Sequence, residues 1–359
     1  MSFITVVLFI VGIVLLIFGA DLLVRGASQL AAGFGVSALL IGLTVVAMGT
    51  SAPELAVSLQ AAMIGEAAIT LGNVVGSNIA NVLLILGIAS LFGGLTVAKP
   101  LITRDVPVMV VASIATLLLA LDGYLSRVDG VLMLLGLAGY MIFTIRGAMI
   151  ESANSTEPRP PITLIMLVRN LGLIVGGLAL LIIGANWLVD GAKIFALQLG
   201  VSELIIGLTI VAVGTSLPEI ATSVIAGLRG ERDIAVGNVV GSNTLNLLLV
   251  LGLTMVLSPT ALEVPPTALR LDLPVMVGVA LLCLPVFFTR YLVSRREGVM
   301  LLGLYIAYTL YLILGAAGSA LVGPYGLLML LVVIPLVVAL LVVRTLHFIA
   351  TERQRGAEK

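Results

Sequence analysis

The chain has 359 residues, of which 60% are hydrophobic and 10% charged, and its formal net charge is zero. With a mean hydropathy of +1.26, it is predicted to be an integral membrane protein and not a soluble domain. The neutral balance and the lack of a basic face exclude nucleic acid as a partner, and a single cysteine, Cys283, excludes a disulfide framework and a thiolate metal site.

Apolar runs long enough to cross about 30 Å of hydrocarbon as helices predict eleven membrane spans. The first run carries no basic segment and no cleavage site, so we expect a retained span and not a signal peptide. Five runs precede a polar, proline-rich segment and six follow it. The runs lie near residues 3–22, 36–64, 67–93, 105–121, 128–148, 163–189, 201–228, 234–258, 272–290, 298–316 and 322–344.

The distribution of Lys and Arg predicts the orientation of these spans in the membrane. If the N-terminus lies outside, fifteen of the 18 basic residues fall in segments on the inner side. The outer segments hold only Arg127, Lys193 and Arg270. The sequence therefore predicts a multi-pass protein of the cell (inner or plasma) membrane with its N-terminus outside and its C-terminus in the cytoplasm.

One stretch of the chain occurs twice, at a constant offset of 165 residues. Residues 42–87 read GLTVVAMGTSAPELAVSLQAAMIGEAAITLGNVVGSNIANVLLILG, and residues 207–252 read GLTIVAVGTSLPEIATSVIAGLRGERDIAVGNVVGSNTLNLLLVLG. Twelve of the first 19 aligned positions are identical, as are twelve of the 17 positions that begin at residue 71. Such agreement is too high for two apolar segments that match by composition alone, so the chain contains an internal repeat.

The repeat extends beyond this stretch, since GADLLVRGA at 19–27 matches GANWLVDGA at 184–192. Five spans separate each residue from its repeat partner, so the second copy is inserted in the opposite orientation, as in secondary transporters. We predict an all-α integral membrane fold: a ten-helix core of two inverted five-helix repeats plus one extra C-terminal transmembrane helix. The predicted parts are residues 1–150, a linker at 151–161, the second repeat at 162–316, the extra helix at 317–345 and a cytoplasmic tail at 346–359.

Each repeat places one carboxylate, Glu54 or Glu219, behind the motif GTSxPE inside an apolar run. A charged side chain at the bilayer centre costs a few kcal/mol, about 3 on insertion scales, and typically marks an ion or substrate site. Pro53 and Pro218 precede the glutamates and remove a backbone donor, which predicts a broken helix with unpaired carbonyl groups. Such groups are tolerated at membrane depth only beside a cavity or an ion. Two carboxylates in equivalent places therefore predict a functional site.

A second motif, GNVVGSNxxN, follows in both copies and adds further polar groups. Its glycines, Gly72, Gly76, Gly237 and Gly241, are expected to serve helix packing. Its first two asparagines in each copy, Asn73, Asn78, Asn238 and Asn243, could either contact an ion or bond neighbouring helices. The Asp-x-Pro pairs that begin at Asp105 and Asp272 are expected to act as helix N-caps.

The repeated motifs supply oxygen donors without imidazole or thiol groups, since the one histidine, His347, lies in the predicted tail. Oxygen ligands favour hard cations such as calcium and sodium, whereas zinc and copper draw on nitrogen or sulfur. Two glutamates neutralise one calcium ion or two sodium ions. Competition between the two ions at one site would follow from this charge balance.

The doubled GTSxPE and GNxxGSNxxN motifs resemble the alpha repeats of the calcium/cation antiporter superfamily, in particular its prokaryotic sodium/calcium exchanger branch. The resemblance covers about residues 1–316 and implies antiport of sodium and calcium by alternating access. It implies that the first and sixth spans slide past the rest. The glycines that would ease this movement are Gly19, Gly26, Gly184 and Gly191. It implies Glu54, Glu219, Thr50 and Thr215 as calcium ligands. It implies additional sodium ligands at Ala47, Ser51, Ser77, Asn81, Ala212, Ser216, Ser242 and Asn246. Some relatives, notably potassium-dependent ones, carry Asp at the position of Asn246, so the site of this chain is less acidic.

We therefore expect a secondary antiporter that exchanges calcium for sodium, embedded in a lipid bilayer, with no cofactor and no obligate protein partner. The alternative is a proton-coupled calcium exchanger, because a carboxylate in a low-dielectric site can bind a proton in the working pH range. A cation channel is a less favoured alternative. An enzyme is not expected, since the sequence contains no P-loop, HExxH or GxSxG motif.

Overall fold

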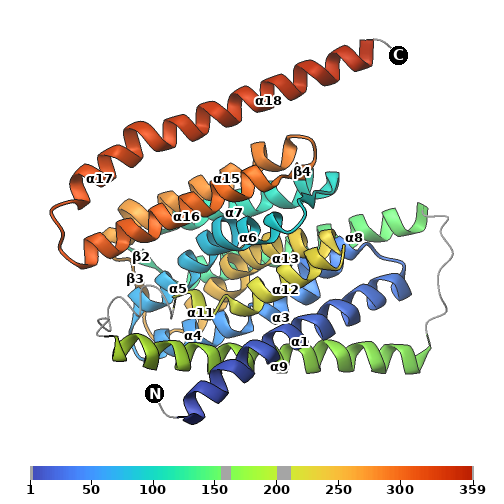
Figure 1. Ribbon diagram of the computed structural model, residues 1–359, viewed down its shortest axis with the longest axis horizontal. Coiled ribbons are helices and arrows are strands. Elements are labelled where there is room, and N and C mark those ends of the chain that lie inside the picture. Colours follow the sequence, from blue (N-terminus) through green and yellow to red (C-terminus); the bar gives the residue numbers. More distant parts are fainter. Residues whose placement is uncertain (1–2, 155–162, 200–211, 358–359) are drawn as a thin grey trace.

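The computed structural model describes residues 3–154, 163–199 and 212–357. Within them, nine helices are long and apolar enough to cross a membrane, and a helix pair bent by 42°, Ala38–Thr50 with Ala52–Met63, makes a tenth span. The predicted seventh span, near 201–228, lies only partly within the described residues. The all-helical membrane fold predicted from the sequence is confirmed, and Figure 1 shows its arrangement.

The first half of the chain alternates long helices with short π-helical and 3₁₀ turns, which carry the label η. Its elements are α1 (Phe3–Phe34), α2 (Ala38–Ile41), η1 (Gly42–Val46), α3 (Ala47–Thr50), α4 (Ala52–Met63), α5 (Ala67–Ala80), η2 (Asn81–Ile85), α6 (Leu86–Leu91), β1 (Leu95–Thr96), η3 (Leu101–Asp105), α7 (Val106–Leu119), η4 (Ala120–Asp122), β2 (Tyr124–Leu125) and α8 (Arg127–Asn154).

The second half repeats this order and adds a C-terminal helix. Its elements are α9 (Leu164–Gln198), α11 (Ala212–Gly214), α12 (Leu217–Leu228), α13 (Arg232–Leu245), η6 (Asn246–Leu251), α14 (Gly252–Leu257), β3 (Leu262–Glu263), η7 (Ala268–Asp272), α15 (Leu273–Phe288), β4 (Leu292–Val293), α16 (Arg295–Ala316), α17 (Val322–Leu328), η8 (Met329–Val333) and α18 (Ile334–Ala357). The bounds of α4 and α12 differ by 165 residues at both ends, as do those of α5 and α13.

Two short strand pairs join the halves in an equivalent way. Strand β1 pairs with β4, and β2 pairs with β3, each in antiparallel register. Since β1 corresponds to β3 in the repeat, and β2 to β4, each pair joins one strand from either half. The eleven-span prediction places both members of each pair on the same side of the membrane. The pairing therefore supports the predicted alternation of the spans, while the side that faces the cytoplasm stays a prediction.

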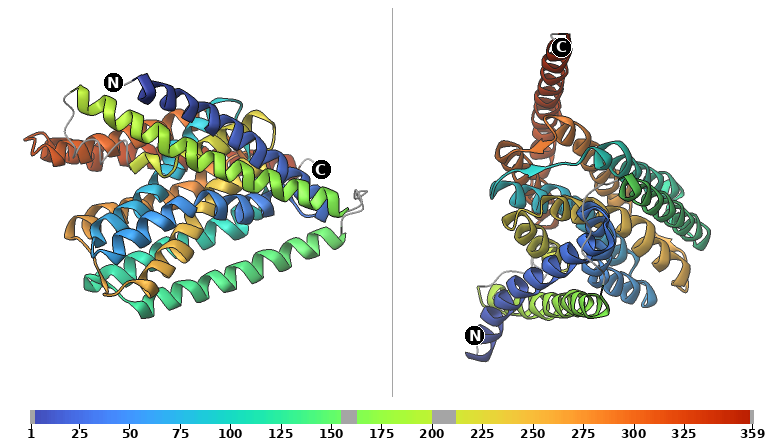
Figure 2. Two further views of the ribbon diagram at one scale, coloured as in Figure 1. Left: turned by 90° about the horizontal axis from the view of Figure 1, so that it is seen from below. Right: turned by 90° about the vertical axis from the view of Figure 1, so that its right-hand side faces the viewer.

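The helices α5 to α6 and α13 to α14 form the centre of the molecule. In the most apolar stretch of each segment, 78% of the residues are buried in α5 to α6 and 83% in α13 to α14. The corresponding share is 22% in α1 and in α9. In Figure 1 the long helices α1 and α9 cross one side of this centre, and α17 and α18 lie on the opposite side. The right-hand view in Figure 2 shows the same separation, with the N-terminus and the C-terminus at opposite ends of the molecule.

The helices α1 and α9 are longer than predicted, because the sequence analysis ended both spans where polar residues begin. They run in opposite directions and meet at glycines. A Cβ atom on Gly19 would lie 2.8 Å from the carbonyl oxygen of Gly177, and one on Gly12 would lie 2.8 Å from that of Gly184. These contacts between backbones explain the close packing of the pair, and they involve two of the four glycines that we associated with helix movement.

Two aspartates that we expected to cap helices make other contacts. Neither Asp105 nor Asp272 forms a side-chain cap hydrogen bond, so this prediction is wrong. Both aspartates end a π-helical turn that continues directly into the next helix, so no free helix N-terminus remains to be capped. Instead, Tyr140 donates its hydroxyl to Asp105 at 3.3 Å and Tyr308 donates to Asp272 at 2.8 Å. Asp105 also accepts hydrogen bonds from Arg104 at 3.1 and 3.2 Å.

The C-terminal helix extends further than expected, since α18 continues to Ala357, past the predicted end of the extra helix at 345. It is joined to the core by an ion pair of 3.0 Å between Arg344 and Glu297. Glu297 also forms the capping box at the start of α16. On the predicted linker, α8 reaches Asn154, and the rest of the segment lies outside the described residues.

Candidate functional site

The two repeated glutamates each begin a new helix at a break in a longer one. Ser51 separates α3 from α4, and Thr215 and Ser216 separate α11 from α12. Pro53 and Pro218 occupy the first turn of the new helices, where a missing N–H group is tolerated and the ring favours the helix start. Glu54 and Glu219 therefore lie in the first turn, where the helix dipole stabilises a negative charge. The predicted helix break is present in both halves.

Both glutamate side chains are completely buried, at 0% exposure. One oxygen of Glu54, Oε1, accepts hydrogen bonds from Ser77 of α5 at 3.5 Å and from Ser216 of the second half at 3.3 Å. The two serine hydroxyls lie 3.2 Å apart. The other oxygen of Glu54, Oε2, has no hydrogen-bond partner among the described residues. The first glutamate is thus surrounded by hydroxyl groups from both halves.

The second glutamate is equally buried but less satisfied. Neither carboxylate oxygen of Glu219 has a hydrogen-bond partner among the described residues. Asn238 links the backbone of Glu219 to Thr50 of the first half, and Ser216, three residues before Glu219, donates to the carboxylate of Glu54. Two unscreened carboxylates in one buried place are costly unless a cation accompanies them. The geometry brings the two repeated acids together, as the sequence analysis required.

Most of the other residues predicted as ion ligands are buried around the same place. Asn81 of η2 and Asn246 of η6 are both 0% exposed. Asn81 donates to Asn243 at 2.9 Å, whereas neither polar atom of Asn246 has a partner among the described residues. The hydroxyls of Ser51 and Ser242 are also buried without a described partner. Ala47 is fully buried in α3, while the side chain of Ala212 lies outside the described residues.

Asn73 and Asn238 form helix-to-helix hydrogen bonds, one of the two roles left open by the sequence. Asn73 donates to the backbone carbonyl of Glu54 at 3.0 Å and to the hydroxyl of Ser58 at 2.9 Å. Its carbonyl oxygen accepts from Thr215 of the other half at 3.2 Å.

Asn238 repeats this pattern in the second half. It donates to the backbone carbonyl of Glu219 at 3.5 Å and to the hydroxyl of Ser223 at 3.0 Å. Its carbonyl oxygen accepts from Thr50 at 3.1 Å. Sequence analysis missed Ser58 and Ser223, although both are polar residues inside a predicted span and occur at the offset of the repeat.

The motif glycines of the second half pack closely against the first half, as predicted. At Gly72 and Gly76 of the first half, no atom of the described residues lies within 4 Å of a Cβ. A Cβ atom on Gly241 would lie 2.7 Å from the carbonyl oxygen of Leu43 and 2.8 Å from the Cβ atom of Ala47. One on Gly237 would lie 3.1 Å from the carbonyl oxygen of Leu39. The absence of side chains at these positions lets α13 approach the segment that carries Thr50 and Ser51.

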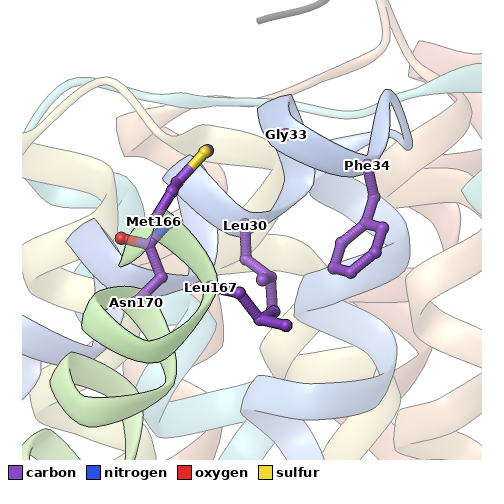
Figure 3. A pocket seen from close by; sticks show the side chains of 6 residues that line it. All are labelled: Leu30, Gly33, Phe34, Met166, Leu167 and Asn170. Carbon is purple, nitrogen blue, oxygen red and sulfur yellow. The ribbon is translucent and has the colours of Figure 1, made fainter. Parts of the chain in front are cut away.

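The arrangement offers oxygen atoms and no nitrogen or sulfur ligands of the kind that transition metals prefer. In the part of the chain that the structure describes, no group of three or more His, Cys, Asp or Glu side chains could hold a metal ion. The donors are instead two carboxylates with serine, threonine and asparagine oxygens, a set that suits hard cations. A small pocket between the ends of α1 and α9 contains neither glutamate and is lined mainly by apolar side chains (Figure 3).

Comparison with known proteins agrees with this chemistry. The family model described as sodium/calcium exchanger protein matches residues 4–146 and 169–314. The chain is 38% identical to the inner membrane protein YrbG of Escherichia coli over 243 residues, which cover 65% of this chain and 74% of that protein. It is 39% identical to the sodium/calcium exchanger MaX1 of Methanosarcina acetivorans over 93 residues, or 26% of this chain and 27% of that one.

Solved structures give the same result at the level of the fold. A structure of the sodium-calcium exchanger NCX_Mj, obtained with sodium and calcium, superposes with a TM-score of 0.74 and 33% sequence identity. The superposition covers 85% of this chain and 97% of that chain. The same exchanger obtained without either ion superposes with a TM-score of 0.73.

Proposed function

Because the chain belongs to the sodium/calcium exchanger protein family, we propose that it exchanges calcium for sodium across the membrane by alternating access. The single observation that carries this proposal is the pair of completely buried glutamates, one from each half, with three of their four carboxylate oxygens lacking a described hydrogen-bond partner. Buried carboxylates without partners are stabilised by a cation, and two of them balance either one Ca²⁺ or two Na⁺. A site that holds either one Ca²⁺ or two Na⁺ couples the transport of one ion to the transport of the other.

The proposed calcium ligands are oxygen atoms of Glu54, Glu219, Thr50 and Thr215. Sodium ions would use further oxygens around them. The proposed additional sodium ligands are Ala47, Ser51, Ser77, Asn81, Ala212, Ser216, Ser242 and Asn246. In this set the alanines would contribute their backbone carbonyl oxygens beside the helix breaks. The carbonyl oxygen of Ala47 also accepts a hydrogen bond from the backbone N–H of Ser51 at 3.0 Å, so the unpaired carbonyl group expected from the sequence is not found at this residue.

Transport requires that the site open to one side of the membrane at a time. The long pair α1 and α9 is placed to control this access, because it crosses one side of the central helices (Figure 2) and both members extend beyond the predicted spans. The proposed topology, with the N-terminus outside and the C-terminus in the cytoplasm, fixes which side is which. Since Cys283 is the only cysteine, a Cys283→Ser background allows a single cysteine at either terminus to be labelled from one side.

The proposal is tested by loading proteoliposomes with sodium and measuring uptake of radiolabelled calcium after dilution into sodium-free buffer. Uptake should depend on the outward sodium gradient, and equal uptake with and without the gradient would overturn the proposal. Glu54→Gln and Glu219→Gln each remove one buried charge, which corresponds to about 3–5 kcal/mol or roughly a 10²- to 10⁴-fold loss of calcium affinity. Variants that retain exchange would show that the ligand assignment is wrong.

Proton-coupled calcium exchange is the second candidate, since burial also favours the protonated form of a carboxyl group. The same proteoliposomes separate the two candidates when the sodium gradient and the pH gradient are collapsed one at a time. Loss of uptake only on collapse of the pH gradient would favour protons as the coupling ion. Steady single-channel currents in planar bilayers would indicate a channel in place of an exchanger.

A further inference from the structure

Two asparagines outside the proposed ligand set connect the halves of the molecule at the site. The amide nitrogen of Asn73 uses both of its N–H groups, one on the carbonyl of Glu54 and one on Ser58, and its oxygen receives the hydroxyl of Thr215. A backbone carbonyl can only accept a hydrogen bond. The nitrogen of Asn73 must therefore face Glu54, its oxygen must face Thr215, and the threonine hydroxyl must be the donor.

The same reasoning applies to Asn238, whose nitrogen faces Glu219 and whose oxygen receives the hydroxyl of Thr50. Each asparagine thus holds the glutamate segment of its own half and the threonine of the opposite half. When a threonine hydroxyl donates to an asparagine, its oxygen lone pairs stay available to a cation. The two bonds cross, so that neither half can shift against the other at the site without breaking them.

We propose that Asn73 and Asn238 are positioning residues for ion exchange, which set the geometry of the ligands contributed by the two halves. The proposal rests on the proposed function, because it assigns to these asparagines the placement of the glutamates and threonines that would bind calcium. Each asparagine donates both of its N–H groups within its own half and accepts a threonine hydroxyl from the other half at its side-chain oxygen, so we assign it to the placement of the residues that it holds. Asn238 is fully buried and Thr50 is fully buried, which makes a bond between them stronger than one in water.

The crossed arrangement provides its own control. Thr215 contacts Asn73 but not Asn238, whereas Thr50 contacts Asn238. We therefore expect Asn73→Leu to be coupled energetically to Thr215→Val and not to Thr50→Val. A double-mutant cycle measures this coupling directly, since two residues that share a hydrogen bond deviate from additivity more than two that do not.

The experiment measures equilibrium binding of radiolabelled calcium to purified full-length protein, together with the half-saturating calcium concentration for uptake. Asn73→Leu should raise both the dissociation constant for calcium and the half-saturating calcium concentration by roughly tenfold, as expected for the loss of one to two net hydrogen bonds. In the Asn73→Leu background, the effect of Thr215→Val should shrink at least threefold by the same conversion, while that of Thr50→Val should be unchanged. Thr215→Ser keeps the hydroxyl that donates to Asn73, so its effect on calcium binding should be smaller than that of Thr215→Val.

Several results would overturn the proposal. If the fold-changes of Asn73→Leu and Thr215→Val simply multiply in the double variant, the hydrogen bond does not position the threonine. A lower melting temperature with unchanged calcium binding would show that Asn73 has a structural role alone. The wild type is measured first, since failure of sodium-driven calcium uptake there would reject the proposed function and, with it, this proposal. If Asn73→Leu does not elute as a single species, the smaller Asn73→Ala replaces it and the counterpart cycle of Asn238 and Thr50 repeats the test.

Discussion

Replacing Gly177 by alanine tests whether the close approach of α1 and α9 stabilises the protein. A Cβ atom at this position would lie 2.7 Å from the carbonyl oxygen of Gly19 and 2.7 Å from the backbone nitrogen of Leu23. Both are backbone atoms of α1, so neither can rotate away. Ordinary contact begins at 3.4 Å, and the helices would have to separate by the difference, about 0.7 Å, along this direction.

Overpacking of this kind costs about 1–3 kcal/mol, and each kcal/mol lowers a melting temperature by roughly 2–4 °C in a domain of a few hundred residues. We therefore expect Gly177→Ala to melt several degrees below the wild type when thermal unfolding of the detergent-purified protein is followed by intrinsic fluorescence. The matched control is Gly172→Ala on the same helix. No atom of the described residues lies within 4 Å of a Cβ there, and alanine is the better helix former.

The comparison between the two variants decides the outcome. Gly172→Ala should melt at or above the temperature of the wild type, because its methyl group occupies open space. If Gly177→Ala and Gly172→Ala melt at the same temperature, the close contact between the backbones does not contribute to stability. The reasoning from interhelical distance would then be refuted for this pair, and with it our explanation for the glycines of α1 and α9.

Three further predictions concern the site and its supports. Asn246→Asp adds a third buried carboxyl group from which calcium must displace a proton, so its half-saturating calcium concentration should rise more steeply than that of the wild type as pH falls from about 8 to 6; an equally steep rise in the wild type would contradict this. Tyr308→Phe removes a hydrogen bond to a carboxylate, worth about 1.5–3 kcal/mol, and should lower the melting temperature more than Tyr140→Phe, whose aspartate keeps its arginine partner; equal shifts would contradict this. Glu297→Ala removes a capping box worth about 1 kcal/mol as well as an ion pair, whereas Arg344→Ala removes only the partly exposed pair, worth at most about 1 kcal/mol. Glu297→Ala should therefore lower the melting temperature of the protein more than Arg344→Ala; the reverse order would count against this prediction.

Much of the fold could be predicted because the chain repeats its sequence. The offset of 165 residues, found from the motifs alone, equals the offset between α4 and α12 and between α5 and α13. The apolar runs predicted the spans, and the proline before each glutamate predicted the helix break. The lengths of α1 and α9 were underestimated because both helices continue past their apolar runs, where polar side chains such as Gln29 and Asp190 are exposed. Hydropathy along the chain does not show that a helix continues into such a polar segment.

The crossed contacts at the site could not be derived from the repeat. An internal repeat says that Asn73 and Asn238 are equivalent, and that Thr50 and Thr215 are equivalent. It does not say whether each asparagine meets the threonine of its own half or of the other. That choice depends on how the two halves pack against each other, which the structure decides in favour of the opposite half.

The difference between the two glutamates is also invisible in the sequence, because the flanking serines are the same in both copies. Ser216 and Ser77 donate to Glu54, while their counterparts Ser51 and Ser242 have no described partner. The residue types are identical, so the difference lies in the placement of the two segments and in the rotation of the hydroxyls. The two-fold axis that relates inverted repeats lies in the membrane plane and exchanges the two sides of the membrane. A protein whose site is open to one side therefore cannot keep its halves equivalent. Unequal surroundings of two equivalent acids are therefore what alternating access requires of an exchanger built from an inverted repeat.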